Sequence, residues 1–103
     1  MVARGEVWWA ELPDAGARPV LVLTRERAIS VLRRVVVVPA TRTVRGIPTE
    51  VRLSGDDGMP EDCALSFDNV STIPKSVLRS RICVLGPERL AEVCQAWRDV
   101  ADC

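Results

Sequence analysis

The sequence predicts a mainly β fold, a small and strongly bent sheet or barrel of five or six short strands closed by one long C-terminal helix. Short runs rich in Val and Leu recur up to about residue 85, separated by Gly- and Pro-containing turns. Only the last segment spaces its apolar residues as a helix does. The chain of 103 residues has no internal repeat and suffices for one domain, so residues 1–103 are expected to form a single domain.

The first strand is predicted over residues 5–11 and carries two adjacent tryptophans. Side chains alternate across a strand, so Trp8 and Trp9 must face opposite ways. One can belong to the core, and the other must meet an interface or a ligand. A loop over residues 12–17 then leads into a buried strand over residues 19–24.

The middle of the chain is predicted to contain two further strands. A brief helical turn at residues 26–32 precedes a strand over residues 33–40, whose unbroken apolar run indicates cover on both faces. An arginine-bearing loop follows. Residues 49–53 alternate and predict an edge or half-buried strand, and residues 54–62 form a long turn.

The last third is predicted to run from strand to helix. Residues 63–67 alternate, with Cys63, Leu65 and Phe67 on one face. A short helix over residues 75–80 leads into a strand over 81–85, and Gly86-Pro87-Glu88 begins the final helix. Its predicted core stripe has Trp97 as the anchor and comprises Leu90, Val93, Cys94, Trp97, Val100 and Ala101.

Cysteine and histidine usage argues against a metal site. The chain has four cysteines, at 63, 83, 94 and 103, with no Cys-x-x-Cys pair, and it has no His. Structural zinc sites need such paired ligands, so no metal or other cofactor is expected. Cys63, Cys83 and Cys94 are interpreted as small buried hydrophobes. Without a membrane-length apolar run or a secretory signal, the expected location is the cytoplasm.

Charge is segregated although the formal net charge is zero. Residues 25–45 hold six arginines and one acid, whereas residues 54–68 hold five acids and no base. Arginine suits phosphate binding, because its planar fork matches phosphate oxygens. The alternative is a solvated segment that pairs with the acidic stretch.

The residue inventory is compatible with RNA cleavage by the substrate's own 2′-hydroxyl. The nucleophile then comes with the substrate and already lies beside its phosphate. The protein has only to accept one proton, supply or stabilise another, and balance charge on the phosphate. Carboxylates, arginines and hydroxyls are sufficient for this.

Four segments in register resemble the MazF/PemK toxin family. They are RGEVWWAEL, ARPVLVLT, VVVVPATRT followed by IPTEV, and ALSFDNVSTI. The resemblance implies a small SH3-like barrel (MazF/PemK/CcdB-like) and a symmetric homodimer. It also implies the toxin of a type II toxin–antitoxin system, a metal-independent, sequence-specific endoribonuclease. Such an enzyme cuts single-stranded RNA at a short sequence and leaves 2′,3′-cyclic phosphate and 5′-hydroxyl ends. The implied partner is an acidic antitoxin.

The resemblance also implies site residues. Arg18 matches the arginine near the scissile phosphate, Thr41 a phosphate-holding hydroxyl, and Asp68 an acid used as general base in some members. The alternative for Arg18 is a loop arginine paired with Asp14 or Glu11. The alternative for Thr41 is a hydroxyl that caps the turn, and the alternative for Asp68 is an Asx turn at the strand end.

A further group of residues is expected to bind RNA around these three. Ser66 stands where some members carry an arginine, so Arg42 or Arg18 would have to supply that charge. Trp8 or Trp9 could stack a base, with the dimer interface as the competing use. The predicted RNA-binding residues are Arg25, Arg42, Arg45, Trp8 and Ser66.

Two other functions remain open from the sequence. A gyrase-inhibiting toxin family shares this barrel and needs no catalysis. A non-enzymatic interaction barrel is the third possibility. Arg18, Thr41 and the arginine-rich segment favour the nuclease over the gyrase inhibitor, because such an inhibitor does not need to bind phosphate.

Overall fold

The computed structural model describes residues 2–13 and 15–102 and contains seven strands and two α-helices. They follow one another as β1 (Glu6–Leu12), β2 (Gly16–Val22), α1 (Glu26–Ile29), β3 (Arg34–Thr41), β4 (Glu50–Leu53), β5 (Cys63–Ser66), β6 (Ser71–Pro74), β7 (Leu78–Val84) and α2 (Pro87–Ala101). Short 3₁₀ turns lie at Gly55–Asp57, Phe67–Asn69 and Lys75–Val77.

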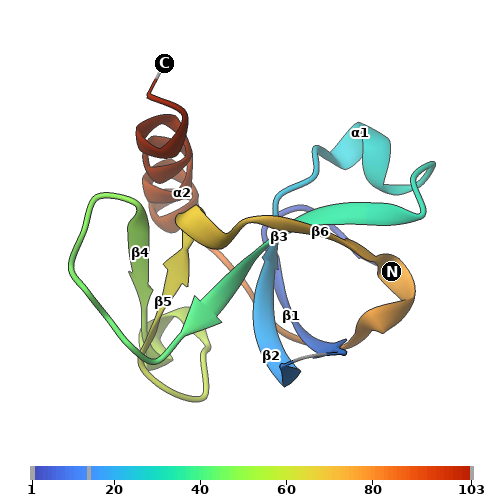
Figure 1. The fold of residues 1–103 in the computed structure, drawn as a ribbon, viewed down its shortest axis with the longest axis horizontal. Coiled ribbons are helices and arrows are strands. Elements are labelled where there is room, and N and C mark those ends of the chain that lie inside the picture. The colour runs from blue at the N-terminus through green and yellow to red at the C-terminus, as the bar shows by residue number, and fades with distance from the viewer. Residues whose placement is uncertain (1, 14, 103) are drawn as a thin grey trace.

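All seven strands belong to one sheet that bends sharply along β3 (Figure 1). The hydrogen-bonded order is β4-β5-β3-β2-β1-β7, and β6 pairs with β3 beside this path. The strand β3 therefore has three partners: β6 along its first half, β2 in its middle, and β5 at Ala40 and Thr41. The predicted mainly β class, a strongly bent sheet with a long C-terminal helix, is confirmed, although no strand pairing in the described part of the chain joins β4 to β7 and closes the ring.

Two apolar clusters fill the two sides of the bent sheet. One lies where α2 covers β4 and the Phe67–Asn69 turn, and it includes Leu53, Leu65, Phe67 and Val93, all nearly inaccessible. The other lies among β1, β2, β3 and β6. Each fully buried aliphatic or aromatic side chain contributes roughly 1.5–3 kcal/mol of transfer free energy, so these clusters provide a rigid support for the strand ends.

Several predicted strand boundaries are wrong. β2 begins at Gly16 rather than residue 19, because the hairpin with β1 keeps pairing down to Leu12 and Gly16. The strand β6 was not predicted, and β7 begins at Leu78 where a helix was expected. Residues 63–67 do not alternate between buried and exposed, since all five are buried beneath neighbouring elements.

The final helix begins at Pro87 as predicted, but its core face is rotated from the predicted stripe. Val93 and Ala96 are the buried residues, and Leu90 and Val100 pack beside them. Trp97 is 45% exposed and is not a core anchor. Cys94 is likewise exposed rather than buried. A small residue such as Ala96 lets the helix approach the sheet, which leaves the large indole at the rim.

Candidate functional site

The candidate site forms where β2 and β3 stop pairing. Their register joins Val22 to Val37 and ends with Val20 opposite Pro39. The same register carried two residues further would place Arg18 opposite Thr41, but the pairing of β2 with β3 has already ended, and Thr41 pairs with Ala64 of β5 on the other edge of β3. The two strand ends therefore diverge, and both residues line the opening between them.

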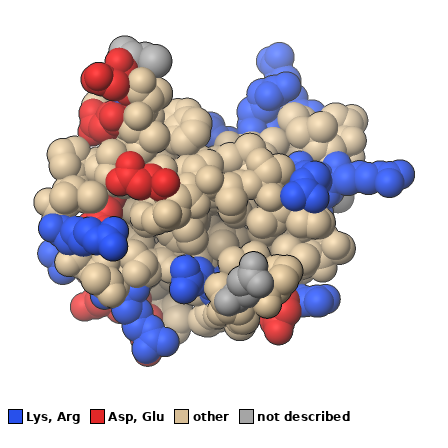
Figure 2. All heavy atoms as spheres, viewed as in Figure 1, with Lys and Arg blue, Asp and Glu red and all other residues tan. Residues whose placement is uncertain are grey.

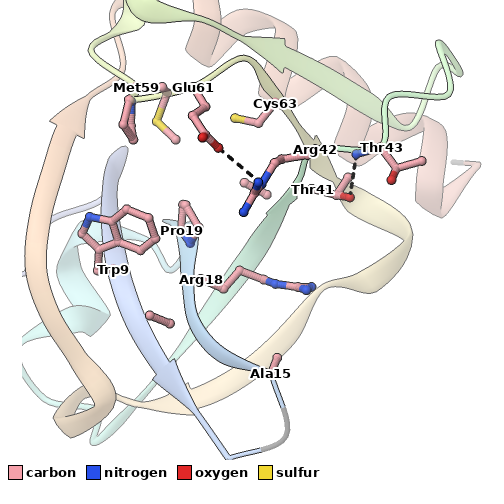
Figure 3. Close-up of a pocket in the computed structure, with 13 residues that line it drawn as sticks. Trp9, Ala15, Arg18, Pro19, Thr41, Arg42, Thr43, Met59, Glu61 and Cys63 are labelled. Atoms are coloured by element: carbon pink, nitrogen blue, oxygen red, sulfur yellow. Dashed lines mark hydrogen bonds and ion pairs between the residues drawn. The ribbon is translucent and has the colours of Figure 1, made fainter.

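This opening is a pocket of about 390 Å³ (Figure 3). Its walls come from β1, β2, the end of β3 and the loop before β5. The polar and aromatic side chains that line it include Trp9, Arg18, Thr41, Arg42 and Glu61. The volume falls in the range that holds small ligands, such as part of a nucleotide.

Arg18 is the most available cation of the pocket. It is exposed on β2, opposite Ala10 of β1, and its guanidinium has no hydrogen-bond or ion-pair partner among residues 2–13 and 15–102. It therefore does not pair with Glu11; Asp14, the other predicted partner, lies outside the described residues. A free guanidinium at a pocket wall can bind an anion without first breaking an internal pair.

Thr41 is the last residue of β3 and lies across the pocket from Arg18 (Figure 3). Its Oγ1 accepts a hydrogen bond of 3.1 Å from the Thr43 backbone N–H, so the hydroxyl does hold the following turn. Because the oxygen accepts in this bond, the hydroxyl proton remains free to donate. The turn-capping role and a phosphate-binding role are therefore compatible.

Arg42 and Glu61 form an ion pair at the mouth of the pocket, with Nε and Oε2 3.3 Å apart. Their side chains are 83% and 62% exposed. This pair joins the arginine-rich segment to the acidic stretch, as the alternative interpretation of the charge pattern expected. Glu61 was not predicted as a site residue; the available signal was its place in the acidic turn that precedes the strand at Cys63.

The two tryptophans do lie on opposite sides of β1. The Trp8 indole N–H donates to Oε1 of the buried Glu6 at 3.0 Å, and its ring packs on the second apolar cluster. Trp9 lines the pocket instead, paired across the hairpin with Pro19. Trp8 was predicted to bind RNA, and the structure places it outside the pocket.

Glu6 explains why Trp8 is held in place. Burial acts to raise the pKa of Glu6, but hydrogen bonds from Trp8, Arg81 and the Ala3 backbone outweigh it, and the pKa lies below its ordinary value. Arg81 also forms an ion pair with Glu6 at 3.0 Å. The start of β1 is therefore a structural network, distinct from the pocket.

Asp68 and Ser66 are not among the described residues that line the pocket. Asp68 accepts a 2.6 Å hydrogen bond from the Thr49 hydroxyl. Ser66 is 4% exposed, and its Oγ accepts from the Asn69 amide at 2.8 Å. The predicted contact between Ser66 and RNA would require this buried hydroxyl to become accessible.

The predicted RNA-binding arginines are divided between two ends of β3. Arg42 lines the pocket, and Arg45 lies in the adjoining loop, held through its backbone N–H to Glu50 at 2.9 Å. Arg25 lies with Arg33 and Arg34 around a separate hollow. Since β3 spans eight residues, roughly 3.3 Å apart along a strand, Arg25 is remote from Thr41. In Figure 2, basic side chains project around α1 and acidic ones gather towards the end of α2.

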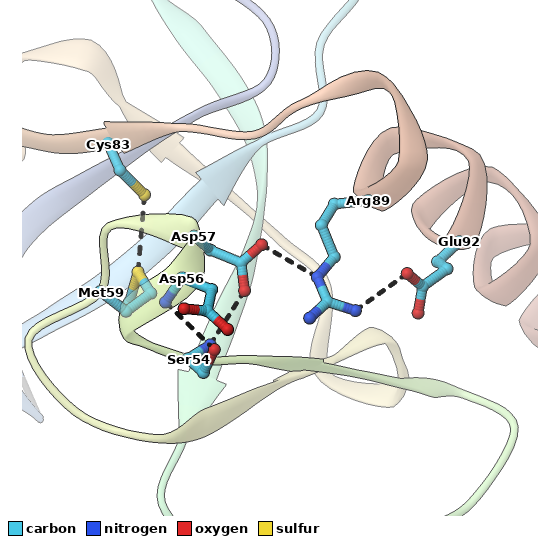
Figure 4. Close-up of polar contacts among 7 residues, drawn as sticks. All are labelled: Ser54, Asp56, Asp57, Met59, Cys83, Arg89 and Glu92. Carbon is cyan, nitrogen blue, oxygen red and sulfur yellow. Dashed lines mark hydrogen bonds and ion pairs between the residues drawn. The ribbon is translucent and has the colours of Figure 1, made fainter.

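The loop between β4 and β5, which carries Glu61 near its β5 end, is anchored near its β4 end (Figure 4). Asp57 accepts from the Ser54 N–H at 2.9 Å within a capping box, and its other oxygen accepts from Arg89 Nε of α2 at 2.9 Å. Burial acts to raise the pKa of Asp57, but these hydrogen bonds lower it below its ordinary value. At Gly58, with φ of +95°, a side chain would meet Cys83 Cβ at 2.8 Å, so the loop needs glycine there.

Neither thiol beside this loop has the character of a nucleophile. Burial raises the pKa of Cys63, which lines the pocket, and of Cys83. A raised pKa leaves little thiolate at neutral pH. Among the described residues, no three His, Cys, Asp or Glu side chains are grouped as metal ligands. In the same part of the chain, no helix is long and apolar enough to cross a membrane.

Comparison with known proteins gives one consistent family. The family model of the PemK-like, MazF-like toxin of type II toxin–antitoxin systems matches residues 3–100. A curated relative, the probable endoribonuclease MazF2 of Mycobacterium tuberculosis, is 46% identical over 101 residues, which cover 97% of this chain and 98% of the relative. The probable endoribonuclease MazF5 of the same species is 43% identical, covering 98% of this chain and 94% of the relative.

Solved structures agree in fold. The Mycobacterium tuberculosis toxin MazF-mt6 superposes with a TM-score of 0.87 at 36% identity, covering 94% of this chain and 96% of that one. An endoribonuclease in complex with its cognate antitoxin, from a mycobacterial species, gives 0.90 at 25% identity, with 99% and 96% covered. The range that the family model matches, residues 3–100, includes β1, Arg18 in β2 and Thr41 at the end of β3. This chain therefore belongs to the PemK-like, MazF-like family of type II toxin–antitoxin toxins.

Proposed function

We propose that this protein is the toxin of a type II toxin–antitoxin pair and an endoribonuclease that cuts single-stranded RNA without a metal. The observation that carries the proposal is the convergence of Arg18 and Thr41 in one open pocket, with the guanidinium unpaired among the described residues. The relatives named as endoribonucleases support the reaction class.

The pocket supplies what attack by the 2′-hydroxyl requires of a phosphate site. The 2′-oxygen loses its proton and bonds to phosphorus, the bond from phosphorus to the 5′-oxygen breaks, and that oxygen takes a proton from water. Arg18 balances charge on the phosphate oxygens, and the Thr41 hydroxyl donates a hydrogen bond to one of them. Asp68 as the proton acceptor stays a prediction, since it lies outside the described lining and bonds to Thr49.

The same proposal includes the protein's partners. The substrate is RNA, and an acidic antitoxin segment covers the Arg18 and Arg42 side of the pocket. The solved mycobacterial endoribonuclease in complex with its cognate antitoxin supports this partner. A two-fold homodimer and a cytoplasmic location, where its RNA substrate would be found, complete the proposal.

Product analysis tests the reaction. Incubation with total RNA in excess EDTA should yield fragments with 5′-hydroxyl and 2′,3′-cyclic phosphate ends. An oligonucleotide with 2′-deoxyribose at the scissile nucleotide should bind and remain intact, because the nucleophile is missing. Loss of cutting with chelator and recovery with a divalent ion would contradict the mechanism, and DNA breaks with intact RNA after induction in cells would favour a gyrase inhibitor.

A further inference from the structure

The pocket has a second half that the phosphate chemistry does not use. Arg18 and Thr41 account for a phosphate, whereas Trp9 and the Arg42–Glu61 pair lie along the remaining wall (Figure 3). An indole and a charged pair beside a phosphate site provide the two things that recognise a base, a stacking surface and an edge of hydrogen-bonding groups.

Glu61 has an oxygen available for such recognition. Its Oε2 faces Arg42 Nε at 3.3 Å, and its Oε1 has no hydrogen-bond partner in the described part of the chain. Among the described residues that line the pocket, Glu61 is the only carboxylate. An ionised carboxylate only accepts hydrogen bonds, so its partner must present donors.

The loop holds Glu61 in position while leaving its carboxylate largely exposed. Asp57 anchors the preceding turn to Arg89 of α2, and Met59, two residues before Glu61, is buried with its sulfur 3.7 Å from Cys83 Sγ. Glu61 itself is 62% exposed. Exposed ion pairs contribute little stability, so a ligand can replace part of the contact to Arg42 at small cost.

Base chemistry then distinguishes the four nucleotides. The Watson–Crick edge of guanine presents two adjacent donors, N1–H and N2–H₂, next to the acceptor O6. Uracil has one N–H between two carbonyl oxygens, and adenine and cytosine each have one amino group beside an acceptor. Two neighbouring donors match the two oxygens of Glu61, and O6 matches a guanidinium donor of Arg42.

We propose that Glu61 makes the pocket selective for a guanine next to the scissile phosphate. Trp9 stacks on the base, Glu61 accepts from its N1–H and N2–H₂, and Arg42 donates to its O6. This inference rests on the proposed nuclease function and adds the identity of one recognised base.

Cleavage of matched oligonucleotides tests it. Cut sites are first mapped in a randomised RNA pool, and each nucleotide flanking the cut is then varied among guanine, inosine, adenine, cytosine and uracil. The wild type should cut the guanine substrate roughly five- to a hundredfold faster than the others, the range for one bidentate contact. Inosine, which lacks the N2 amine, should fall between guanine and adenine.

Glu61→Gln should reduce the guanine preference to a few-fold or less, because the amide retains one acceptor and adds a donor. Asp62→Asn is the matched control: it removes the same charge from an exposed neighbouring residue that does not line the pocket. Any general gain in affinity for RNA from lost repulsion should appear in both variants. Only Glu61→Gln should change the preference among bases.

The outcomes separate the two proposals. Wild-type protein that cuts RNA without favouring guanine on either side of the cut, or Glu61→Gln protein that keeps the full preference, overturns the inference and leaves the nuclease standing. If wild-type protein cuts no RNA, the proposed function fails. Equilibrium binding of the same oligonucleotides then decides the inference, which is overturned if guanine binds no more tightly than uracil.

Discussion

Two arginine–carboxylate pairs lie at the two ends of the loop between β4 and β5, and they differ in surroundings. Arg89 and Asp57 are 2.9 Å apart, with side chains 32% and 9% exposed, and Asp57 also caps the Ser54 turn. Arg42 and Glu61 are 3.3 Å apart and largely in solvent. The first pair joins the loop to α2, whereas the second ends at the pocket.

The comparison shows how one loop separates stability from binding. A shielded carboxylate with several donors resists exchange, because removing any donor leaves charge poorly solvated. An exposed pair is screened by water and salt and is readily exchanged for a ligand. The anchored end can therefore hold the open end in position while its charges remain available.

The largest expected effect falls on the phosphate half of the pocket. Arg18→Ala and Thr41→Ala should each lower the cleavage rate roughly 100- to 1,000-fold, because each removes a donor to the developing charge. Single-turnover cleavage of a labelled oligonucleotide measures this, with circular dichroism as the check on folding. Ser66→Ala should change the rate much less, and Asp68→Asn tests the predicted general base. Wild-type rates in folded Arg18→Ala and Thr41→Ala would refute the site.

Breaking the anchored pair should affect stability most. Asp57→Ala removes the acceptor of both Ser54 N–H and Arg89, and we expect a loss of about 1–3 kcal/mol in the free energy of unfolding. Glu61→Ala, at the open end, should change it by about 0.5 kcal/mol or less. Urea unfolding monitored by circular dichroism measures both. Equal losses in the two variants would show that the ends of the loop do not differ as described.

The anchored pair should also make stability depend on pH. Asp57 has a lowered pKa in the folded protein, so the unfolded chain binds its proton first and stability falls as pH drops through the acidic range. Glu6 contributes in the same direction. Urea midpoints of the wild type should decline between about pH 5 and pH 3, and those of Asp57→Asn should decline less. If the urea midpoints of both proteins decline in parallel, Asp57 does not contribute to the pH dependence of stability.

The smallest expected effect concerns the arginines. On an Arg18→Ala background, Arg45→Ala should reduce the log–log salt slope of RNA binding by about 0.7, the value for one contact to a single-strand phosphate. Arg42→Ala should reduce the slope less, because Arg42 contacts a base edge. Arg25→Ala, at the far end of β3, should leave it nearly unchanged. Fluorescence anisotropy at several salt concentrations provides the slopes. An equal change for Arg25 would place RNA along the whole arginine-rich segment.

The fold was predictable where one local pattern dominated. The apolar run at Val35–Val38 and the Gly86-Pro87-Glu88 helix start correspond to β3 and α2. The β6 strand was missed because Ser71–Pro74 is polar and ends in proline, and only its pairing to β3 makes it a strand. The apolar stripe misplaced Trp97, since packing against β4 and not hydrophobicity alone decides which helix face is buried.

The site was predictable only in part. Arg18 and Thr41 follow from the resemblance to the family, and the structure brings them together through the divergence of β2 and β3. Glu61 and Trp9 depend on long-range geometry. The alternation rule separated the tryptophans but could not tell which one faces the pocket, because the deciding contact is the Glu6 carboxylate on Trp8.

The distribution of the three tryptophans gives the protein an internal optical reporter. The chain has no tyrosine, so its near-ultraviolet emission comes from Trp8, Trp9 and Trp97 alone. Only Trp9 lines the pocket, whereas Trp8 is hydrogen-bonded to Glu6 and Trp97 lies on α2. A Trp8→Phe, Trp97→Phe protein would therefore carry a single fluorophore at the pocket wall. Quenching of that fluorophore by a stacked base would follow occupancy directly, without a label on the RNA.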